Sequence, residues 1–253
     1  MLANVRRNKI HELLIEDGTA SVSDLSKIFK VSEVTIRQDL AKLEKEDLII
    51  REHGGAYLKG LSNQVQSFSF QHMDNMDKKA IIGKKAAELI EDGDTIIIDS
   101  GTTTTEIAKN ILNRKNLTVI TNAINIPFII GGQAGITVLL TSGEFKAPTL
   151  SLTGQKAADF FENLHVDKLF LATAGVTLRA GLTYPSVSDL PVKRAMIDAA
   201  STVYLVADSS KVGRPSLASL GALSLIHYFI TDNAIKEEDK KDFANHHIEF
   251  IIA

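Results

Sequence analysis

The chain contains no cysteine and no tryptophan among its 253 residues, and it has only five prolines. The absence of cysteine excludes disulfide bonds, cysteine-ligated zinc, iron–sulfur clusters and thiol catalysis. No apolar run approaches the roughly 20 residues that a membrane-spanning helix needs. The first residues reach Arg6 and Arg7 without passing through an apolar signal core. We therefore expect a chain that has no membrane segment and works in the cytoplasm.

A strong excess of one charge is also missing, because 31 acidic residues face 28 basic ones and the net charge is -3. The overall charge thus gives no indication of a nucleic-acid partner, and any such evidence must come from local pattern. With 44% hydrophobic and 23% charged residues, the composition is that of an ordinary globular protein. The length suggests one large domain or two smaller ones.

Two kinds of pattern divide the chain. Residues 1–58 are short amphipathic helical segments, and from about residue 80 onward apolar runs alternate with helical periodicity. The apolar runs are continuous, which is typical of parallel strands buried on both faces, so the fold class is α/β. Expected strands cover 95–99, 117–121, 136–140, 168–172, 202–208, 227–231 and 248–252, and expected helices lie near 83–91, 103–113, 155–163, 190–200 and 236–244.

The first 58 residues predict three helices. The first covers 4–15, with Val5, Ile10, Leu13 and Leu14 on one face, and stops at Asp17-Gly18. Ser21 with Asp24 fits a capping box for a second helix, whose Leu25, Ile28 and Phe29 point inward. After a short turn, Ser32 caps a third helix that starts at Glu33. This helix turns Val34, Ile36, Leu40 and Leu43 in part toward the core.

A short strand at 48–50 and a turn at His53-Gly54-Gly55 follow the third helix and predict a wing. A winged helix-turn-helix reads the major groove with the first turns of its third helix, where Ser, Thr, Gln and Arg are good donors. The pattern alone fits equally well a small helical domain with a solvated face. The local charge does not decide between the two.

The stretch from Val31 to Leu40, followed by Arg51-Glu52-His53-Gly54-Gly55-Ala56, resembles the DNA-binding domain of the DeoR-type bacterial transcriptional regulators. The resemblance implies a double-stranded DNA operator as partner. The DNA-binding residues that it implies are Ser32, Glu33, Thr35, Arg37, Gln38, Lys42, Arg51 and His53. Gln38 departs from the family pattern, which often has a second basic residue after the arginine.

A second candidate site lies where the strand at 95–99 runs through Asp99-Ser100-Gly101 into a helix that begins with four threonines, Thr102 to Thr105. Such a turn presents free backbone N–H groups and the positive end of a helix to an anion, and hydroxyls add donors. It lacks the lysine of a P-loop and the spacing of a dinucleotide fingerprint. The alternative is an ordinary helix start, in which Thr103 and Glu106 form a capping box.

Other expected strands also end in small or polar residues, and ligands of open α/β sheets bind beyond such carboxyl ends. Taken singly, each of these ends fits a turn at least as well. Their order and spacing resemble the DeoR-type sensor domain, which is similar in fold to ribose-5-phosphate isomerase and glucosamine-6-phosphate deaminase. The effector-binding residues that this resemblance implies are Asp99, Ser100, Gly101, Thr102, Thr103, Thr104, Thr121, Asn122, Gly143, Gly175, Lys193, Asp208 and Lys211. Where the family has paired acidic residues before the Lys193 helix, this chain has Ser188-Asp189.

The expected organisation is a winged helix-turn-helix over 1–58, a linker over 59–76 and an α/β effector domain over 77–253. The expected function is a non-enzymatic transcriptional regulator, a repressor of sugar-metabolism genes that a phosphorylated sugar relieves. The alternative is an isomerase- or deaminase-like enzyme in which Asp208, Lys211 or Glu144 does acid–base work. A third possibility is a module whose helical domain binds protein. An isomerase has no need of a helix-turn-helix, which favours the regulator.

We expect no metal and no cofactor. His246 and His247 are adjacent, so their side chains diverge. One small winged helix contacts one half-site, so we expect a homo-oligomer, dimer or tetramer, held together by the larger α/β domain.

Overall fold

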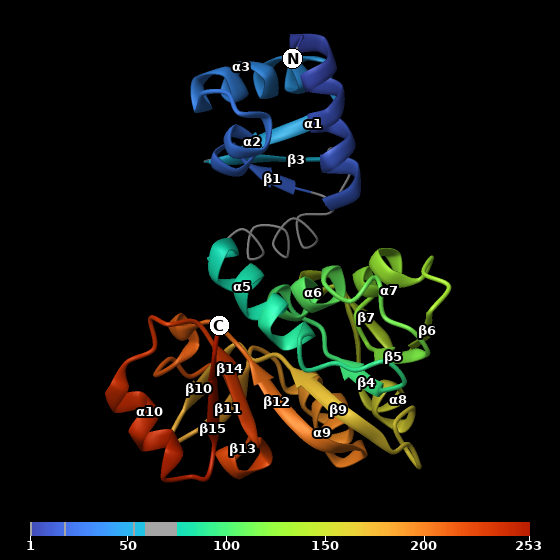
Figure 1. Cartoon of the computed structure of the whole chain (residues 1–253), viewed down its shortest axis with the longest axis vertical. Coiled ribbons are helices and arrows are strands. Elements are labelled where there is room, and N and C mark those ends of the chain that lie inside the picture. The colour runs from blue at the N-terminus through green and yellow to red at the C-terminus, as the bar shows by residue number, and fades with distance from the viewer. Residues whose placement is uncertain (1, 18, 53, 59–74) are drawn as a thin grey trace. The chain divides into compact units, whose positions relative to one another are not determined.

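The computed structural model describes residues 2–17, 19–52, 54–58 and 75–253. The chain divides into two compact units, Met1–Asp74 and Asn75–Ala253 (Figure 1). Most of the expected linker, residues 59–74, lies outside the described residues, and so does His53. No helix in the described ranges combines the length and the apolar character that crossing a membrane requires.

The described residues of the first unit form three helices and a three-stranded antiparallel sheet. Its elements are α1 (Ala3–Asp17), β1 (Thr19–Ser21), α2 (Val22–Phe29), α3 (Glu33–Lys45), β2 (Ile49–Glu52) and β3 (Gly55–Leu58). The strand order is β1-β3-β2, so the expected wing of β2 and β3 is extended by one more strand. Ile10, Leu14, Leu25, Ile36 and Leu40 form the centre of its core.

A serine caps the start of α2 and another caps the start of α3. The Ser21 hydroxyl accepts the Asp24 N–H at 2.9 Å and donates to the Asp24 carboxylate at 2.6 Å. The Ser32 hydroxyl accepts the Thr35 N–H at 3.2 Å. Lys30 closes α2 with a left-handed backbone, φ 53°. The two capped helices that the sequence predicts are confirmed.

The helical pattern of the sequence predicts three apolar side chains in the core that are exposed to solvent in the structure. Val5, Ile28 and Val34 are 45%, 59% and 61% exposed. Val34 lies two residues before the buried Ile36, and at about 100° per residue this is the opposite side of α3. On α2 the buried stripe runs through Val22 and Leu25, and Ile28 lies about 60° beyond Leu25 and about 120° from Val22, at the margin of this stripe.

The second unit is organised around a seven-stranded sheet in the order β15-β14-β12-β9-β4-β5-β6. Every pairing in it is parallel, as the continuous apolar runs predict. Its strands are β4 (Thr95–Ile98), β5 (Leu117–Thr121), β6 (Ile136–Leu140), β9 (Val166–Leu171), β12 (Ala200–Val206), β14 (Tyr228–Thr231) and β15 (Glu249–Ile252). All seven expected strands are confirmed, with ends that move by no more than two residues.

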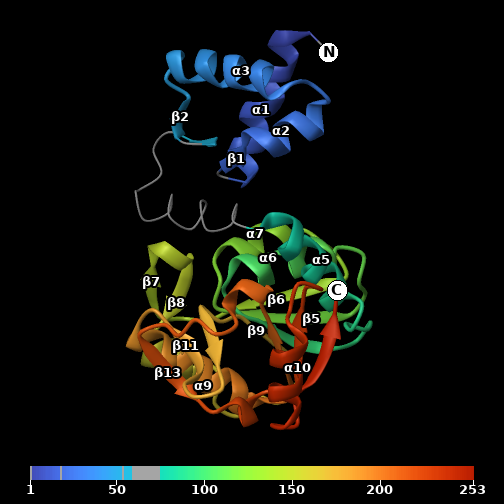
Figure 2. The same cartoon turned by 90° about the vertical axis from the view of Figure 1, so that its left-hand side faces the viewer.

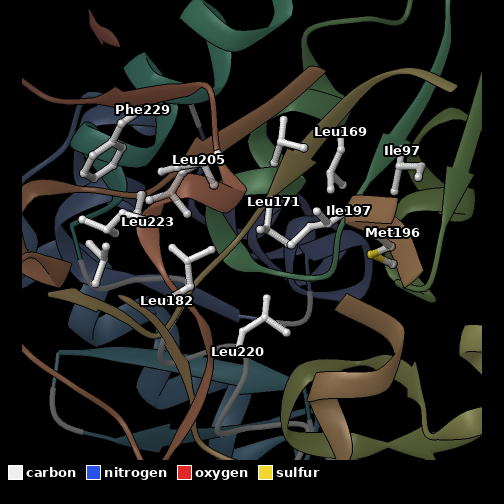
Figure 3. Packing of buried hydrophobic residues seen from close by; sticks show 14 of the residues in the cluster. Ile97, Leu169, Leu171, Leu182, Met196, Ile197, Leu205, Leu220, Leu223 and Phe229 are labelled. Atoms are coloured by element: carbon white, nitrogen blue, oxygen red, sulfur yellow. The ribbon is translucent and has the colours of Figure 1, made fainter. Parts of the chain in front are cut away.

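Helices cover both faces of this sheet (Figures 1 and 2). On one face lie α5 (Met76–Ala87), α6 (Thr102–Lys109) and α7 (Asn125–Ile130), and on the other lie α8 (Gln155–Asp159), α9 (Leu190–Ala199) and α10 (Glu237–Ala244). Alternate strand residues enter two separate cores: Ile96 and Ile98 pack under α5 to α7, whereas Ile97 packs toward α9. Figure 3 shows the second core, in which Leu169, Leu171 and Met196 meet.

The sequence missed several short elements. These are α7 and the antiparallel strands β7 (Glu144–Lys146), β8 (Ser151–Thr153), β10 (Gly175–Thr177), β11 (Gly181–Tyr184) and β13 (Ala218–Gly221). Strands of three or four residues give too little periodicity to recognise. The helix expected at 83–91 is wrong in its bounds, since α5 covers Met76–Ala87. Helix α5 packs closely on α6 at Gly83, because a Cβ at this position would lie 2.7 Å from the Glu106 carbonyl carbon.

Candidate functional sites

The outer face of α3 carries most of the residues implied for DNA binding. Arg37, Gln38 and Lys42 are exposed, and Thr35 is half-buried beside the exposed Ser32 cap. Arg37 donates to the Glu33 carboxylate at 2.7 Å, and both side chains are about half exposed. Their charges therefore cancel locally on the face that would meet DNA.

The wing is attached to α3 through Arg51. Its guanidinium donates to the Glu44 carboxylate at 2.6 Å, and its backbone N–H reaches the same carboxylate at 3.3 Å. This hydrogen bond lowers the pKa of Glu44 below the usual value. The charge of Arg51 is thus paired within the unit, and Arg51 orients β2 against α3.

Two residues of α3 have roles that the sequence did not suggest. The exposed Val34 can offer its methyl groups to a thymine methyl in the major groove. Asp39, in contrast, is buried and accepts a hydrogen bond from the Arg6 guanidinium at 2.6 Å. The Arg6–Asp39 pair fixes α3 on α1. An inward aspartate among polar residues gives no signal in a hydrophobic pattern.

The turn between β4 and α6 has the geometry of a helix start with free amides. The first intrahelical bond joins the Thr105 N–H to the Gly101 carbonyl at 3.0 Å. The N–H groups of Thr102 to Thr104 therefore have no acceptor within their own helix. The capping-box alternative is wrong, because Gly101 is the N-cap and no side chain caps α6.

The threonines of this turn divide into two pairs. The hydroxyls of Thr104 and Thr105 donate back to the Gly101 carbonyl at 3.0 Å and 2.7 Å. This leaves Thr102 and Thr103 as the hydroxyls of the cluster that are not bound to the turn itself. Gly101 is needed for a packing reason, since a Cβ there would lie 2.7 Å from the Cβ of Ala172. The backbone of Gly101 is extended, with φ 166°.

Beside the turn lies a buried ion pair between Asp99 and Lys193. The Lys193 ammonium donates to the Asp99 carboxylate and, at 3.2 Å, to the Ser100 hydroxyl. The Asp99 carboxylate also accepts the N–H groups of Ser100 at 2.7 Å and of Ala172 at 3.0 Å. The turn after β4 and helix α9 thus meet at one point, which brings together Asp99, Ser100 and Lys193.

The electrostatics of this point are set by burial. Burial raises the pKa of Asp99, and the neighbouring Lys193 ammonium opposes that rise. Burial also raises the pKa of Tyr184 well above its usual value, and the charges of Asp99 and Asp189 add to it. The Tyr184 ring lies 5.5 Å from the Lys193 ammonium, and its hydroxyl donates to the Ala172 carbonyl at 2.7 Å.

Thr121 and Asn122 support the turn from the neighbouring strand. The Thr121 hydroxyl donates to the Ile98 carbonyl at 2.6 Å and accepts the Ala123 N–H at 3.0 Å. The Asn122 side chain accepts the Ser100 N–H at 3.0 Å and donates to the Leu152 carbonyl at 3.1 Å. Both side chains are fully buried, so they position the turn.

Gly143 and Gly175 are places of close backbone packing. Gly143 has φ 133°, in the region that favours glycine, and a Cβ there would lie 2.8 Å from the Thr153 carbonyl oxygen. A Cβ at Gly175 would overlap the Arg214 carbonyl. The role of each glycine in the structure is steric.

Asp208 and Lys211 lie farther along the sheet, because β12 is separated from β4 by β9. One Asp208 oxygen accepts the Ser210 N–H at 3.0 Å and the Asn75 amide at 3.4 Å, so it fixes the start of α5. Lys211 is half-buried in the turn that follows. Arg194, which follows Lys193 in α9, donates to the Leu220 carbonyl.

The hairpin of β7 and β8 supplies a residue that the sequence missed. The Lys146 ammonium donates to both carboxylate oxygens of Asp189 at 2.6 Å. Asp189 is the buried acidic residue that immediately precedes α9 and Lys193. Lys146 lies in a three-residue strand within a loop, where no pattern marks it. Within the described ranges, no group of three or more His, Asp or Glu side chains could hold a metal ion.

Comparison with known proteins matches both units to models of one family. Residues 6–59 match the DeoR-like helix-turn-helix domain, and residues 74–233 match the DeoR C-terminal sensor domain. The chain belongs to the DeoR family of transcriptional regulators.

Other DeoR-family proteins resemble it over almost their whole length. The HTH-type transcriptional regulator GlpR of Haloferax volcanii is 33% identical over 242 residues, which cover 96% of this chain and 94% of that protein. The glycerol-3-phosphate regulon repressor of Escherichia coli is 31% identical over 244 residues, with 96% of each chain covered. Relatives named as DNA-binding regulators place this DeoR-family protein among transcriptional regulators, not enzymes.

Solved structures similar to the DeoR-family chain include ribose 5-phosphate isomerase A from Methanocaldococcus jannaschii. The two are 16% identical with a TM-score of 0.40, over 55% of each chain.

Proposed function

We propose that this chain represses genes of sugar metabolism by binding an operator with α3 and its wing, and that a phosphorylated sugar releases it. The observation that carries the proposal is the helix start at Thr102 beside the buried Asp99–Lys193 pair, inside the unit that matches the sensor domain. We propose the cytoplasm as its location. The domain limits proposed are 1–58 and 77–253, with 59–76 between them.

On the DNA side, the proposed contacts are Ser32, Glu33, Thr35, Arg37, Gln38, Lys42, Arg51 and His53, with Val34 added. Arg37 has to leave Glu33 before it can reach a base or a phosphate. An exposed pair of this kind on a helix contributes only about 0.3–0.5 kcal/mol, so the exchange costs little. Glu33 then lies near phosphates, where its charge opposes binding and tunes the affinity.

On the effector side, the phosphate is proposed to accept from the free amides of Thr102 to Thr104 and from the hydroxyls of Thr102 and Thr103. The positive end of α6 favours the anion. Because the charge of Lys193 is already neutralised by Asp99, the backbone amides and the positive end of α6 supply the main attraction for the phosphate. Asp189 and Lys146 are proposed to meet the sugar hydroxyls, since their mutual pair can open toward a ligand.

Asn122, Thr121, Gly143 and Gly175 are proposed to shape this site, because their contacts hold the surrounding backbone. Asp208 and Lys211 are proposed to act at the same sheet edge from β12. We propose a homo-oligomer, dimer or tetramer, because specific operator affinity usually needs two half-sites.

The test begins by selecting operator sequences from a pool of random duplexes with the full chain. Glycerol 3-phosphate, glucose 6-phosphate and fructose 6-phosphate are then titrated into the labelled complex, with their unphosphorylated parents in parallel. Typical allosteric coupling of about 1–3 kcal/mol predicts a roughly 5–150-fold loss of operator affinity with one phosphate ester. Failure to select any duplex, or a response to the parent sugars alone, would overturn the proposal.

A matched pair of lysine variants localises the effector. Lys146→Met removes the cation next to Asp189, and it should weaken the response to the active phosphate ester at least tenfold. Lys241→Met changes a lysine on α10 and serves as the control that responds like the wild type. Equal responses of the two variants would remove Lys146 from the site.

A further inference from the structure

One edge of the large sheet is formed by a run of sequence without charge. Residues 116–143 contain no Asp, Glu, Lys, Arg or His, although 23% of the whole chain is charged, so these 28 residues would hold about six charged ones at the average content. The run forms β5, α7 and β6, and β6 is the last strand on its side of the sheet. A run of this length without charge is unusual for a chain in which 23% of the residues are charged.

Large apolar side chains are exposed on this edge. Phe128 on α7 is 86% exposed, and Leu139 and Leu140 on β6 are 39% and 40% exposed. Natural sheets protect an edge strand with lysine, proline, a bulge or a covering element. The residues of β6, Ile136 to Leu140, include no charge and no proline. Among the described strands, β6 pairs with β5 and with no other.

Strand β6 carries large apolar side chains on both faces, together with Thr137 on the face of Leu139. Ile136 and Val138 belong to the core under α5, α6 and α7. Leu139 points to the other face, where helices α8 and α9 bury Ile97 and Ile120 of the inner strands but leave Leu139 exposed. An edge with unpaired backbone groups and apolar residues on both faces has the composition of an interface.

We propose that β6 pairs with β6 of a second copy of this chain, antiparallel across a two-fold axis, so that two seven-stranded sheets become continuous. The proposal deepens the proposed function, because the second copy brings the second DNA-binding unit. Antiparallel self-pairing centred on Val138 sets Thr137 opposite Leu139 of the partner subunit, and the reverse, as an isologous contact requires.

The absence of charge favours a copy of the same chain over a charged partner. A strand without charge meets its own copy with no like-charge repulsion, whereas like charges directly opposite each other destabilise a strand pair. A surface meant for an acidic or a basic partner would carry complementary charges, and residues 116–143 carry none. Phe128 and Leu140 extend the apolar contact beyond the backbone pairing.

Sedimentation equilibrium of the full chain tests the interface with two matched substitutions. Leu139→Lys places a charge on the edge, and Leu217→Lys makes the same change at a leucine that is 81% exposed before β13. We expect a dimer or a tetramer for the wild type and for Leu217→Lys, and at least a tenfold higher dissociation constant for Leu139→Lys. Unchanged near-ultraviolet circular dichroism of the tyrosines shows that the variants are folded.

The absence of cysteine allows a second, independent measurement. Thr137→Cys should be joined as a covalent dimer by a short bis-maleimide, because the residue lies near its own copy at the axis. Leu217→Cys should stay monomeric in denaturing gels. A Leu139→Lys protein that associates like the wild type, a Thr137→Cys protein that gives no cross-linked dimer, or a monomeric wild type would each overturn this interface.

These results are separate from the failure of the proposed function. If the wild type selects an operator and responds to a phosphate ester while Leu139→Lys still dimerises, only the interface is wrong. If the wild type selects no duplex at all, the proposed function is wrong, whatever the state of association.

Discussion

The substitution Lys193→Met tests the electrostatics of the effector site. It removes the cation that faces the fully buried Asp99 carboxylate and keeps a side chain of similar length. Removing one partner of a buried ion pair typically costs about 3–5 kcal/mol, because the remaining charge is left uncompensated. We expect the second unit to lose stability in this range at pH 8.

The same substitution predicts a dependence on pH with a definite sign. Burial already raises the pKa of Asp99, and without Lys193 nothing comparable opposes that rise. A carboxyl whose pKa is higher in the folded state than in the unfolded state binds more protons when folded. Its destabilising effect therefore grows as pH rises from the unfolded value of about 3.9 through the folded value. The cost of Lys193→Met should be smaller at pH 5 than at pH 8.

Urea unfolding followed by near-ultraviolet circular dichroism measures this cost. Three of the four tyrosines lie in the second unit, and the stacked rings of Phe170, Tyr204 and Tyr228 make the signal specific to it. With a slope of about 3 kcal/mol/M, the midpoint should fall by roughly 1–1.7 M urea at pH 8. The double variant Asp99→Asn with Lys193→Met, which removes both charges, is the control and should be more stable than Lys193→Met alone.

The reasoning is refuted if Lys193→Met lowers the free energy of unfolding by less than about 1 kcal/mol at pH 8, where the expected loss is at least about three times larger. An equal cost at pH 5 and pH 8 would also contradict it, because Asp99 would then not be the group left uncompensated.

Three further predictions concern other contacts. Glu33→Gln should strengthen operator binding a few-fold at low salt, since it removes a negative charge near phosphates and frees Arg37; an affinity that falls in a gel-shift titration would contradict this. Gly101→Ala should lower the thermal midpoint of the second unit, and Ala172→Gly in the same chain should restore it, because the two Cβ atoms would lie 2.7 Å apart; differential scanning calorimetry without restoration would contradict the packing argument. Arg6→Met should destabilise the first unit by roughly 1.5–3 kcal/mol, measured by urea unfolding of far-ultraviolet signal, because it removes the 2.6 Å hydrogen bond to the buried Asp39 and leaves only the Arg7 guanidinium at 3.6 Å; a neutral effect would show that Arg7 alone compensates this carboxylate.

The sequence predicted the parts of the fold that extend over several residues with a regular pattern. The seven parallel strands were found because each is a segment of four to seven residues rich in Val, Ile, Leu and aromatic residues, and helices α2 and α3 were found because Ser21 and Ser32 mark their starts. The short strands β7 and β10 could not be found, because three residues define no period.

The candidate site was predicted in its residues but not in its contacts. Sequence pattern and resemblance brought out Asp99, Ser100 and Lys193, yet the buried pair that joins them depends on α9 reaching back to β4. Lys146 was missed for a related reason, since its partner Asp189 is 43 residues away along the chain. The inward turn of Asp39 and the exposure of Val34 depend on where the core lies around α3, which composition does not fix.

The contact between α5 and α6 has a mechanical consequence. Gly83 allows α5 to approach Glu106 so closely that no side chain fits between the helices, and closely packed elements move as rigid bodies. Helix α6 begins at the turn proposed to receive the phosphate, and α5 is the first element after the segment that joins the second unit to the first. A shift of α6 on binding of the proposed phosphate would therefore displace α5 through this contact, and α5 begins at Met76, next to the first residue of the second unit.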